Sequence, residues 1–331
     1  MAKIDPKNIS GARKVSMPEF LRPQLATLMS EPPTGDDWLH ELKFDGYRML
    51  GHLNGGEVRF WSRNGKDWTE KFGNLTKILK TLSVNNAILD GEVVVVDPKG
   101  RSSFQKLQQS MGTGGSPGAT FVYQVFDVIY LDGYSLTKTP LAERKAVLEK
   151  LLAADKSKGQ LRYSDHVAGN GEQFFKQACE YGIEGIVSKR ADSLYESTRN
   201  KNWVKVKCNK RQEFVVAGYT PSKKGFPGFG SLILGVYDKG KLVYSGRVGT
   251  GFTIKQRLAL QEKLDRISQD SMPFAVKPKD PGLRDAHWAK LKLIAEVEFT
   301  EWTADGSVRH PSFKGLRADK KATEVVREDP K

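Results

Sequence analysis

The sequence has few of the features that mark membrane, secreted or zinc-binding proteins. No apolar run approaches the ~20 residues that a membrane-spanning helix needs, and the first residues, MAKIDPKNISGARK, contain no apolar segment of a secretory signal. The two cysteines, Cys179 and Cys208, and the five histidines lack metal-ligand spacing, which argues against both a zinc site and a disulfide framework. We therefore expect a cytoplasmic protein with no membrane partner.

The phosphate-binding motifs of the common nucleotide-binding folds are missing as well. GxxxxGK[ST] does not occur, which excludes a P-loop enzyme, and Gly249-Thr250-Gly251 lacks the third glycine of a dinucleotide fingerprint. No arrangement of histidines supports a histidine-dependent nucleophile. If the protein binds a nucleotide, it must do so with a motif other than these.

Positive charge is abundant. Lys and Arg outnumber Asp and Glu by 53 to 39 in 331 residues, a formal charge of +14. Such a surplus favours a polyanionic partner, and nucleic acid is the usual candidate once a membrane is set aside, although a basic surface can also serve solubility. The length suits two domains.

Hydrophobic patterning predicts an α+β fold with antiparallel sheets. Short apolar and β-branched runs predict strands at residues 38–42, 47–53, 57–62, 87–89, 93–96 and 121–130. The 87–89 and 93–96 strands flank a tight corner at Asp90-Gly91. Helical periodicity covers residues 141–152 and 172–181, and the Gly-rich stretch 112–118 is predicted to be a loop.

After the basic run 205–211 the pattern changes to short strands around one helix. Strands are predicted at residues 213–220, 231–237, 241–248 and 291–299, with a helix from Thr253 to about Ile267. This order suits a small barrel such as the OB-fold. We expect a lead-in over 1–36, a first domain over 37–210 and an OB-fold domain over 211–331.

A possible nucleophile lies in the segment 41–48, ELKFDGYR. Here Lys43 follows an apolar strand and precedes an Asp-Gly turn, with Arg48 five residues beyond it. A lysine amine attacks phosphorus only when it is neutral, a form that nearby cations and desolvation favour. Alone, the pattern KxDGxR fits a solvated surface hairpin equally well.

Six further segments accompany this one in order and together span nearly the whole chain: SRNG (62–65), LDGE (89–92), VFD (125–127), EGIVSK (184–189), WVKVK (203–207) and RHPSFKGLRADK (309–320). With these motifs the chain resembles the covalent nucleotidyltransferases, which comprise DNA ligases, RNA ligases and mRNA capping enzymes. The resemblance implies an antiparallel-sheet adenylation (nucleotidyltransferase) domain followed by an OB-fold β-barrel.

The resemblance assigns Lys43 as the nucleophile that becomes covalently adenylated by ATP. Period-two alternation in WVKVK sends Lys205 and Lys207 to one face, where they would bind the α-phosphate and help keep Lys43 unprotonated. Glu92 is given a ribose or metal role and Glu184 a metal role, because carboxylates suit Mg²⁺ or Mn²⁺. In isolation these lysines would fit a solvated edge strand, and the carboxylates ordinary turn residues.

The resemblance also implies how the nucleotide is held. Phe126 would stack on the adenine, although a phenylalanine in such a strand is otherwise more often core. Arg48 and Arg63 would contact ribose and phosphate, and Glu41 matches the position that reads the base edge. Lys189 completes the expected nucleotide-binding residues.

Four residues of the second domain, Arg309, Arg317, Asp319 and Lys320, would close over the β- and γ-phosphates and orient pyrophosphate as leaving group. Arginine suits this task because its planar fork binds phosphate bidentately. We expect a hinge near residues 207–212.

Within the superfamily, the segments 18–28, 181–208 and 232–252 most resemble the ligase module of bacterial ligase D, the end-joining enzyme. NAD-dependent ligases carry an extra N-terminal domain and a cysteine-ligated zinc, so the short lead-in and the two cysteines favour ATP. The expected substrate is nicked double-stranded DNA, sealed by a monomer in the bacterial cytosol or nucleoid. A Ku-type end-binding protein and polymerase or phosphoesterase modules are possible partners.

Three alternatives remain open. An mRNA capping guanylyltransferase shares the lysine chemistry but uses GTP, and an RNA ligase would prefer nicked RNA. A nucleic-acid-binding protein that keeps the fold without catalysis is the third. Retention of Lys43, Glu92, Glu184, Lys205 and Lys207 argues against the last.

Overall fold

The computed structural model describes residues 4–96, 102, 107, 110–111, 120–153, 159–208, 210–222 and 227–328. The chain divides into two compact units, Met1–Cys208 with Pro330–Lys331 and Asn209–Asp329. The predicted loop over residues 112–118 lies outside the described residues. Among the described residues, no helix has the length and apolar character needed to cross a membrane.

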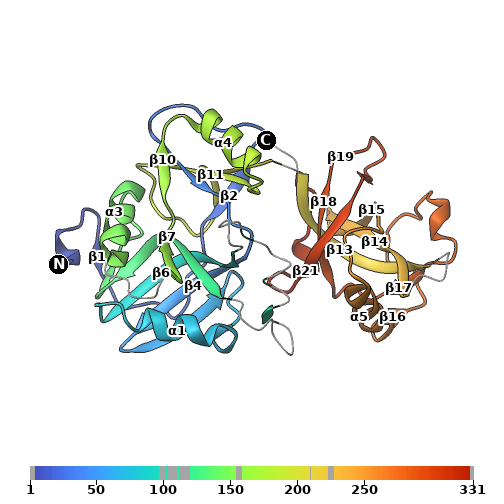
Figure 1. The fold of residues 1–331 in the computed structure, drawn as a ribbon, viewed down its shortest axis with the longest axis horizontal. Helices are drawn as coiled ribbons and strands as arrows, with labels where there is room; N and C mark the ends of the chain where they lie inside the picture. The colour runs from blue at the N-terminus through green and yellow to red at the C-terminus, as the bar shows by residue number, and fades with distance from the viewer. Residues whose placement is uncertain are drawn as a thin grey trace. The chain divides into compact units, whose positions relative to one another are not determined.

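The first sheet of the first unit follows the order β1-β8-β7-β6-β4-β5, with β9 parallel to β7. Its strands are β1 (Arg13–Lys14), β4 (Tyr47–Asn54), β5 (Glu57–Ser62), β6 (Asn86–Val95), β7 (Phe121–Leu131), β8 (Tyr134–Ser135) and β9 (Leu161–Tyr163). One face carries buried apolar side chains such as Met49, Val93 and Tyr123. Helices α1 (Gly73–Leu79) and α3 (Leu141–Leu152) pack against this sheet (Figure 1). Short 3₁₀ turns cover Pro6–Asn8 and Thr69–Phe72.

The predicted corner at Asp90-Gly91 is wrong, because β6 runs through it as one strand with register shifts at Ile88/Leu89 and Asp90/Gly91. Gly91 is needed for close packing instead of a turn. A Cβ there would lie 2.5 Å from the Tyr123 ring and 2.6 Å from the Gln124 carbonyl oxygen. The continuous strand places Asp90 and Glu92 two residues apart, on one face.

The second sheet follows the order β10-β3-β11-β12-β2. Its strands are β2 (Leu25–Leu28), β3 (Trp38–Leu42), β10 (His166–Ala168), β11 (Gly185–Arg190) and β12 (Arg199–Lys207). Helix α4 (Gly171–Glu180) packs on β3 and β11, where Ala178, Ile186 and Val206 are buried together. Both β1 and β2 lie in the predicted lead-in. β2 joins this sheet by pairing in parallel with β12.

Helix α3 buries two consecutive cations, Arg144 and Lys145. The Arg144 guanidinium donates two hydrogen bonds of 2.8 Å to Asp127, and both side chains have no exposed surface. This ion pair fixes α3 to β7.

We predict that Arg144→Met lowers the free energy of unfolding by about 3–5 kcal/mol, because it leaves the Asp127 carboxylate buried and unpaired. Urea denaturation measures the loss. Lys150→Met on the exposed side of the same helix is the matched control and should change stability by less than about 0.5 kcal/mol. Equal stabilities of the two variants would contradict the prediction.

The second unit is built around one long, shared strand, β13. It pairs with β14 and β17 toward its C-terminal end and with β18 along residues 210–215, and β18 continues to β21. The elements are β13 (Lys210–Pro221), β14 (Phe229–Asp238), β15 (Lys241–Val248), α5 (Ile254–Asp265), β16 (Ser268–Gln269), β17 (His287–Ala289), β18 (Ile294–Phe299), β19 (Glu301–Trp302), β20 (Val308–Arg309) and β21 (Ser312–Arg317), with 3₁₀ turns at Pro281–Leu283 and Ala322–Glu324.

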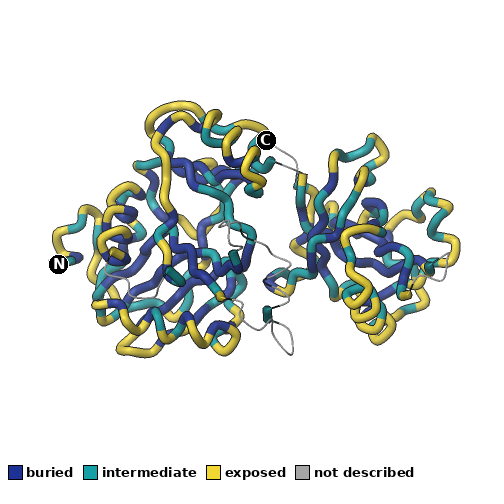
Figure 2. Tube along the Cα trace, in the orientation of Figure 1, coloured by how far each residue is buried: buried dark blue, intermediate teal, exposed yellow. Residues whose placement is uncertain are grey.

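Each unit has its own buried core along its central strands (Figure 2). In the second unit Thr253 caps α5, since its side chain accepts from the Gln256 amide and the Gln256 side chain accepts from the Thr253 amide. The predicted α+β class is confirmed.

Candidate functional site

The second sheet of the first unit gathers the predicted nucleophile and lysines on one face. Glu41 and Lys205 pair with the same residue of β11 from its two sides. Gly185 pairs with Lys207 and accepts the Lys43 backbone amide at 2.9 Å. Directly paired residues share a face, so Glu41, Lys43, Lys205 and Lys207 belong to the face opposite α4.

Lys43 contacts a carboxylate that lies far away in the sequence. Its Nζ is 2.5 Å from Oε2 of Glu184, and the two side chains are 21% and 9% exposed. Gly185 makes this approach possible: a Cβ there would lie 2.0 Å from the Val206 carbonyl oxygen, at a φ of +150°. The glycine lets β11 begin tightly against β12, which brings Glu184 to the nucleophile.

Arg48 is held rigidly on β4. Its guanidinium donates to both Asp90 oxygens, at 2.9 and 2.6 Å, and to the Gln24 carbonyl at 2.6 Å. Tyr195 donates to Asp90 at 2.6 Å. Burial alone would lower the pKa of Arg48, but the Asp90 carboxylate raises it overall. Arg48 is therefore a fixed, permanently charged group.

Phe126, half-buried on β7, lies among cations. The Arg48 guanidinium is 5.2 Å and the Lys189 ammonium 4.2 Å from its ring centroid. Trp203 packs edge-on at 6.1 Å. The ring therefore joins the inner faces of the two sheets, and its partners are those of a cation–π contact.

Glu41 forms a buried cluster with two lysines. Its Oε1 accepts from Lys145 at 2.7 Å and its Oε2 from Lys189 at 2.8 Å, and none of the three side chains is more than 3% exposed. Lys145 lies in none of the motifs from which the site was predicted. Its position on α3, four residues after Leu141 and three before Leu148, put it on the apolar stripe and was the available signal.

Burial and charge act differently on the pKa of Lys189 and on the pKa of Glu41. Burial lowers the pKa of Lys189 from 10.5 to about 8, with Glu41 opposing the shift and Lys145 reinforcing it. For Glu41 burial raises the pKa, but Lys145 and Lys189 outweigh it and lower the pKa overall. Glu41 is therefore ionised at neutral pH.

The lowered pKa of Lys189 makes the free energy of unfolding depend on pH. Between pH 8 and 10.5 the unfolded chain holds a proton that folded Lys189 has lost, so the free energy of unfolding rises with pH in this window. We predict that the stability difference between wild type and Lys189→Met grows by about 1 kcal/mol per pH unit there. Denaturation at several pH values measures it, and a flat difference would contradict the shift.

Glu92 and Arg63 come from the first sheet. Glu92 pairs with Arg48 across β6 and β4 and is half-buried. Arg63 lies in the turn after β5, which Gly65 closes with a φ of +72°. Among the described residues no group of three or more His, Cys, Asp or Glu side chains is placed to hold a metal ion. Glu92 lies on β6 of the first sheet, and Glu184 lies just before β11 of the second sheet, in the same unit.

The predicted residues of the second unit fall into two places. Arg317 donates to Asp319 at 2.9 and 2.8 Å and to Glu296 at 3.1 Å. Lys320 contacts Glu213 at 2.6 Å. Arg309 instead pairs with Glu301 at 2.6 Å in the β19–β20 hairpin, with both side chains about half exposed.

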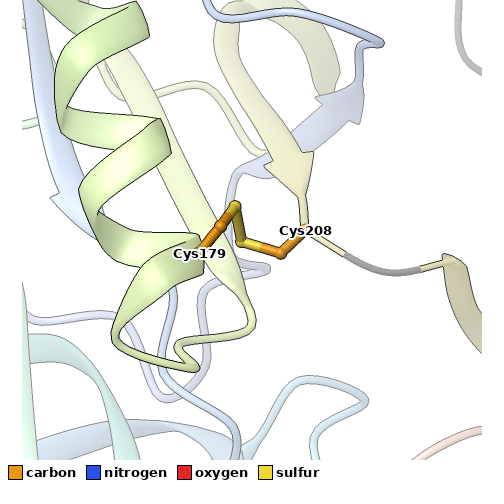
Figure 3. Close-up of a disulfide and its surroundings, with 2 residues drawn as sticks. All are labelled: Cys179 and Cys208. Carbon is orange, nitrogen blue, oxygen red and sulfur yellow. A yellow bond between two sulfur atoms is a disulfide. The ribbon is translucent and has the colours of Figure 1, made fainter.

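The prediction against a disulfide is wrong. Cys179, in the last turn of α4, and Cys208, immediately after β12, form a disulfide with a Cα–Cα distance of 5.4 Å (Figure 3). Their 29-residue separation concealed the contact, which arises because the end of α4 packs against the end of β12. The crosslink encloses Glu184, Lys189, Lys205 and Lys207.

We predict that reducing this disulfide lowers the free energy of unfolding by about 3–4 kcal/mol, because a loop of this length constrains the unfolded chain by that amount. Guanidinium denaturation with and without a dithiol reductant measures the loss. The Cys179→Ser/Cys208→Ser variant serves as the control, since its stability should not respond to the reductant. Reductant-insensitive wild-type protein would contradict the prediction.

Comparison with known proteins matches both units. A family model described as ATP dependent DNA ligase domain matches residues 23–207, and one described as ATP dependent DNA ligase C terminal region matches residues 226–320. The chain is 39% identical over 320 residues to the multifunctional non-homologous end joining protein LigD of Pseudomonas aeruginosa, covering 96% of this chain and 38% of that protein.

Two further similarities agree with these matches. The chain is 36% identical over 293 residues to the multifunctional non-homologous end joining DNA repair protein LigD of Mycobacterium tuberculosis, covering 88% of this chain and 37% of that protein. A solved structure of mycobacterial DNA ligase D complexed with ATP and MES is similar at a TM-score of 0.66 and 34% identity, covering 92% of this chain and 98% of that one. The chain thus spans less than two-fifths of the length of these two curated relatives.

Proposed function

Because the chain belongs to the ATP-dependent DNA ligase family, we propose that it seals nicks between a 5′-phosphate and a 3′-hydroxyl through an adenylate on Lys43. Membership confirms the predicted family and enzyme class. The observation that carries the proposal is the Lys43 amine, 2.5 Å from Glu184, on a sheet face that also holds Lys205 and Lys207.

In the first step the neutral Lys43 amine attacks the α-phosphorus of ATP in line. A nitrogen–phosphorus bond forms, the bond to the bridging oxygen breaks, pyrophosphate leaves with its electron pair, and the nitrogen releases one proton to solvent. Glu184 holds the amine in place, and Lys205 and Lys207 neutralise the charge that develops on the phosphoryl oxygens. Fixed charges that need no reorganisation are the main catalytic resource for such transfers.

The nucleotide is held between the two sheets of the first unit. Phe126 stacks on the adenine, and Glu41 and Lys189 read the base edge. Arg48, fixed by Asp90, and Arg63 contact ribose and phosphate. Preorganised partners of this kind bring the α-phosphorus to the nucleophile without further ordering.

The second and third steps use DNA. The 5′-phosphate at a nick takes the AMP from Lys43, which releases the amine, and the 3′-hydroxyl then displaces AMP and closes the backbone.

Residues 207–212 act as the hinge between the two units. Arg309, Arg317, Asp319 and Lys320 orient the leaving pyrophosphate, with the Arg317–Asp319 pair acting as one preformed group.

Glu92 and Glu184 are the residues that would hold a divalent cation. Carboxylates fit Mg²⁺ or Mn²⁺, because such ions prefer oxygen ligands, keep several waters and share the phosphate oxygens of the substrate. When bound, the ion supplies charge stabilisation at the phosphates.

We also propose how the protein binds DNA, where it acts and which partners it has. The surplus of 14 positive charges favours binding to DNA phosphates without base readout, so affinity should fall with salt by a slope near ~0.9 per phosphate neutralised. We place the activity in end joining in the bacterial cytosol or nucleoid, as a monomer. A Ku-type end-binding protein and polymerase or phosphoesterase modules are the partners.

The test is a pair of assays on the wild-type chain with a divalent metal. α-Labelled ATP should leave covalent label on the denatured protein, and α-labelled GTP should not. A nick in duplex DNA should be sealed faster than the same nick in duplex RNA. Preferential GTP labelling would instead favour a guanylyltransferase, preferential RNA sealing an RNA ligase, and the absence of any label a non-catalytic protein.

A further inference from the structure

Lys145 lies at the inner end of a chain of buried charges that leads to Phe126. Its ammonium, on α3, donates to Glu41 Oε1 at 2.7 Å and to the Ser164 carbonyl at 2.9 Å. The second Glu41 oxygen accepts from Lys189 at 2.8 Å. One carboxylate is therefore shared by two ammonium groups.

The two lysines are held differently. Lys145 is fixed by Glu41, by a backbone carbonyl and by the Tyr163 ring, whose centroid is 4.5 Å away. Lys189 contacts Glu41 and lies over the Phe126 and Trp203 rings, 4.2 and 4.3 Å from their centroids. Removing one partner of a buried ion pair is costly because it leaves an uncompensated charge. Since Lys145 stays on Glu41, Lys189 can turn toward a bound base without leaving the carboxylate unpaired.

We propose that Lys145 is a positioning residue for nucleobase selection: it holds the Glu41 carboxylate in place, so that Glu41 accepts from the base while Lys189 donates to it. This inference rests on the proposed adenylation function. Adenine presents an amino donor beside a ring-nitrogen acceptor, and guanine presents the reverse order. A carboxylate only accepts and an ammonium only donates, so an acceptor at Glu41 beside a donor at Lys189 matches the order of groups on adenine and opposes the order on guanine.

Loss of Lys145 should weaken this match in a specific way. Glu41 would then bind Lys189 alone, or take up a proton and become a donor as well as an acceptor. In both cases the carboxylate and ammonium no longer present a fixed acceptor and donor to the base. Discrimination between ATP and GTP should fall more than the rate of adenylation itself.

The experiment measures kcat/KM for covalent labelling by α-labelled ATP and α-labelled GTP. In Lys145→Met the ATP/GTP ratio should fall by about tenfold or more, mainly through a higher KM for ATP, as expected when ground-state binding is lost. Lys150→Met, an exposed position on the same helix, should keep the wild-type ratio. The ratio is the readout because general destabilisation lowers both activities together.

A double-mutant comparison tests whether Lys145 affects base selection through Glu41. If Lys145 acts through Glu41, adding Lys145→Met to Glu41→Gln changes the ATP/GTP ratio no further. This pair of variants also carries the test if Lys145→Met alone does not fold, because both replace the Glu41 carboxylate with a neutral amide, so that neither buries a carboxylate that has lost Lys145. A wild-type ratio in folded Lys145→Met, or a further change in the double variant, overturns the proposal. Absence of labelling in wild type would instead overturn the proposed function.

Discussion

Lys43→Ala should abolish covalent labelling by α-labelled ATP, with a loss of at least about 1,000-fold in the rate of nick sealing, because removal of a nucleophile leaves only binding and electrostatic effects. The structure sharpens this expectation. Lys43 Nζ is 2.5 Å from Glu184 and about one-fifth exposed, so it is a held, accessible amine. Denaturing electrophoresis after incubation with ATP and Mg²⁺ measures the label.

Two controls define what the loss means. Lys77→Ala, on the exposed side of α1, should label like wild type. A nick supplied with AMP already on its 5′-phosphate should still be sealed by Lys43→Ala within about tenfold of wild type, since the last step does not use the amine as nucleophile. Covalent label on Lys43→Ala equal to wild type would remove Lys43 from the proposed role.

The sequence predicted helices and strands well where the periodicity of the apolar residues is enough to distinguish the two. The helix expected over residues 141–152 is α3 with the same bounds, and the strand expected over 241–248 is β15. The corner expected at Asp90-Gly91 is absent because Gly91 serves close packing against Tyr123, a tertiary cause that no local pattern contains.

The candidate site was predictable as a set of residues but not as a set of contacts. The motifs supplied Lys43 and Glu184, yet nothing in a separation of 141 residues shows that their side chains meet. That contact depends on the register of β11 against β3 and β12. Lys145 lies outside every motif, and the Cys179–Cys208 disulfide depends on how α4 packs.

Glu184→Gln should separate two roles that the geometry leaves combined in one carboxylate. Its oxygen is 2.5 Å from Lys43 Nζ, and we also propose it as a metal ligand. Loss of the charge should slow adenylation by about 100- to 1,000-fold, the range found when one preorganised electrostatic group is removed. Single-turnover labelling over a series of Mg²⁺ concentrations measures both the limiting rate and the metal dependence.

The metal dependence decides the role. If Glu184 holds the ion, the Mg²⁺ concentration for half-maximal rate should rise by about tenfold or more, as it does when metal ligation is weakened. If Glu184 only positions Lys43, the limiting rate falls while the metal dependence stays as in wild type, and the metal assignment is wrong. Glu180→Gln, exposed at the end of α4 four residues earlier, is the matched control because it removes the same charge close to the same loop. If this control also loses activity, the effect of Glu184→Gln comes from the net charge of the loop. Neither proposed role of Glu184 would then be supported.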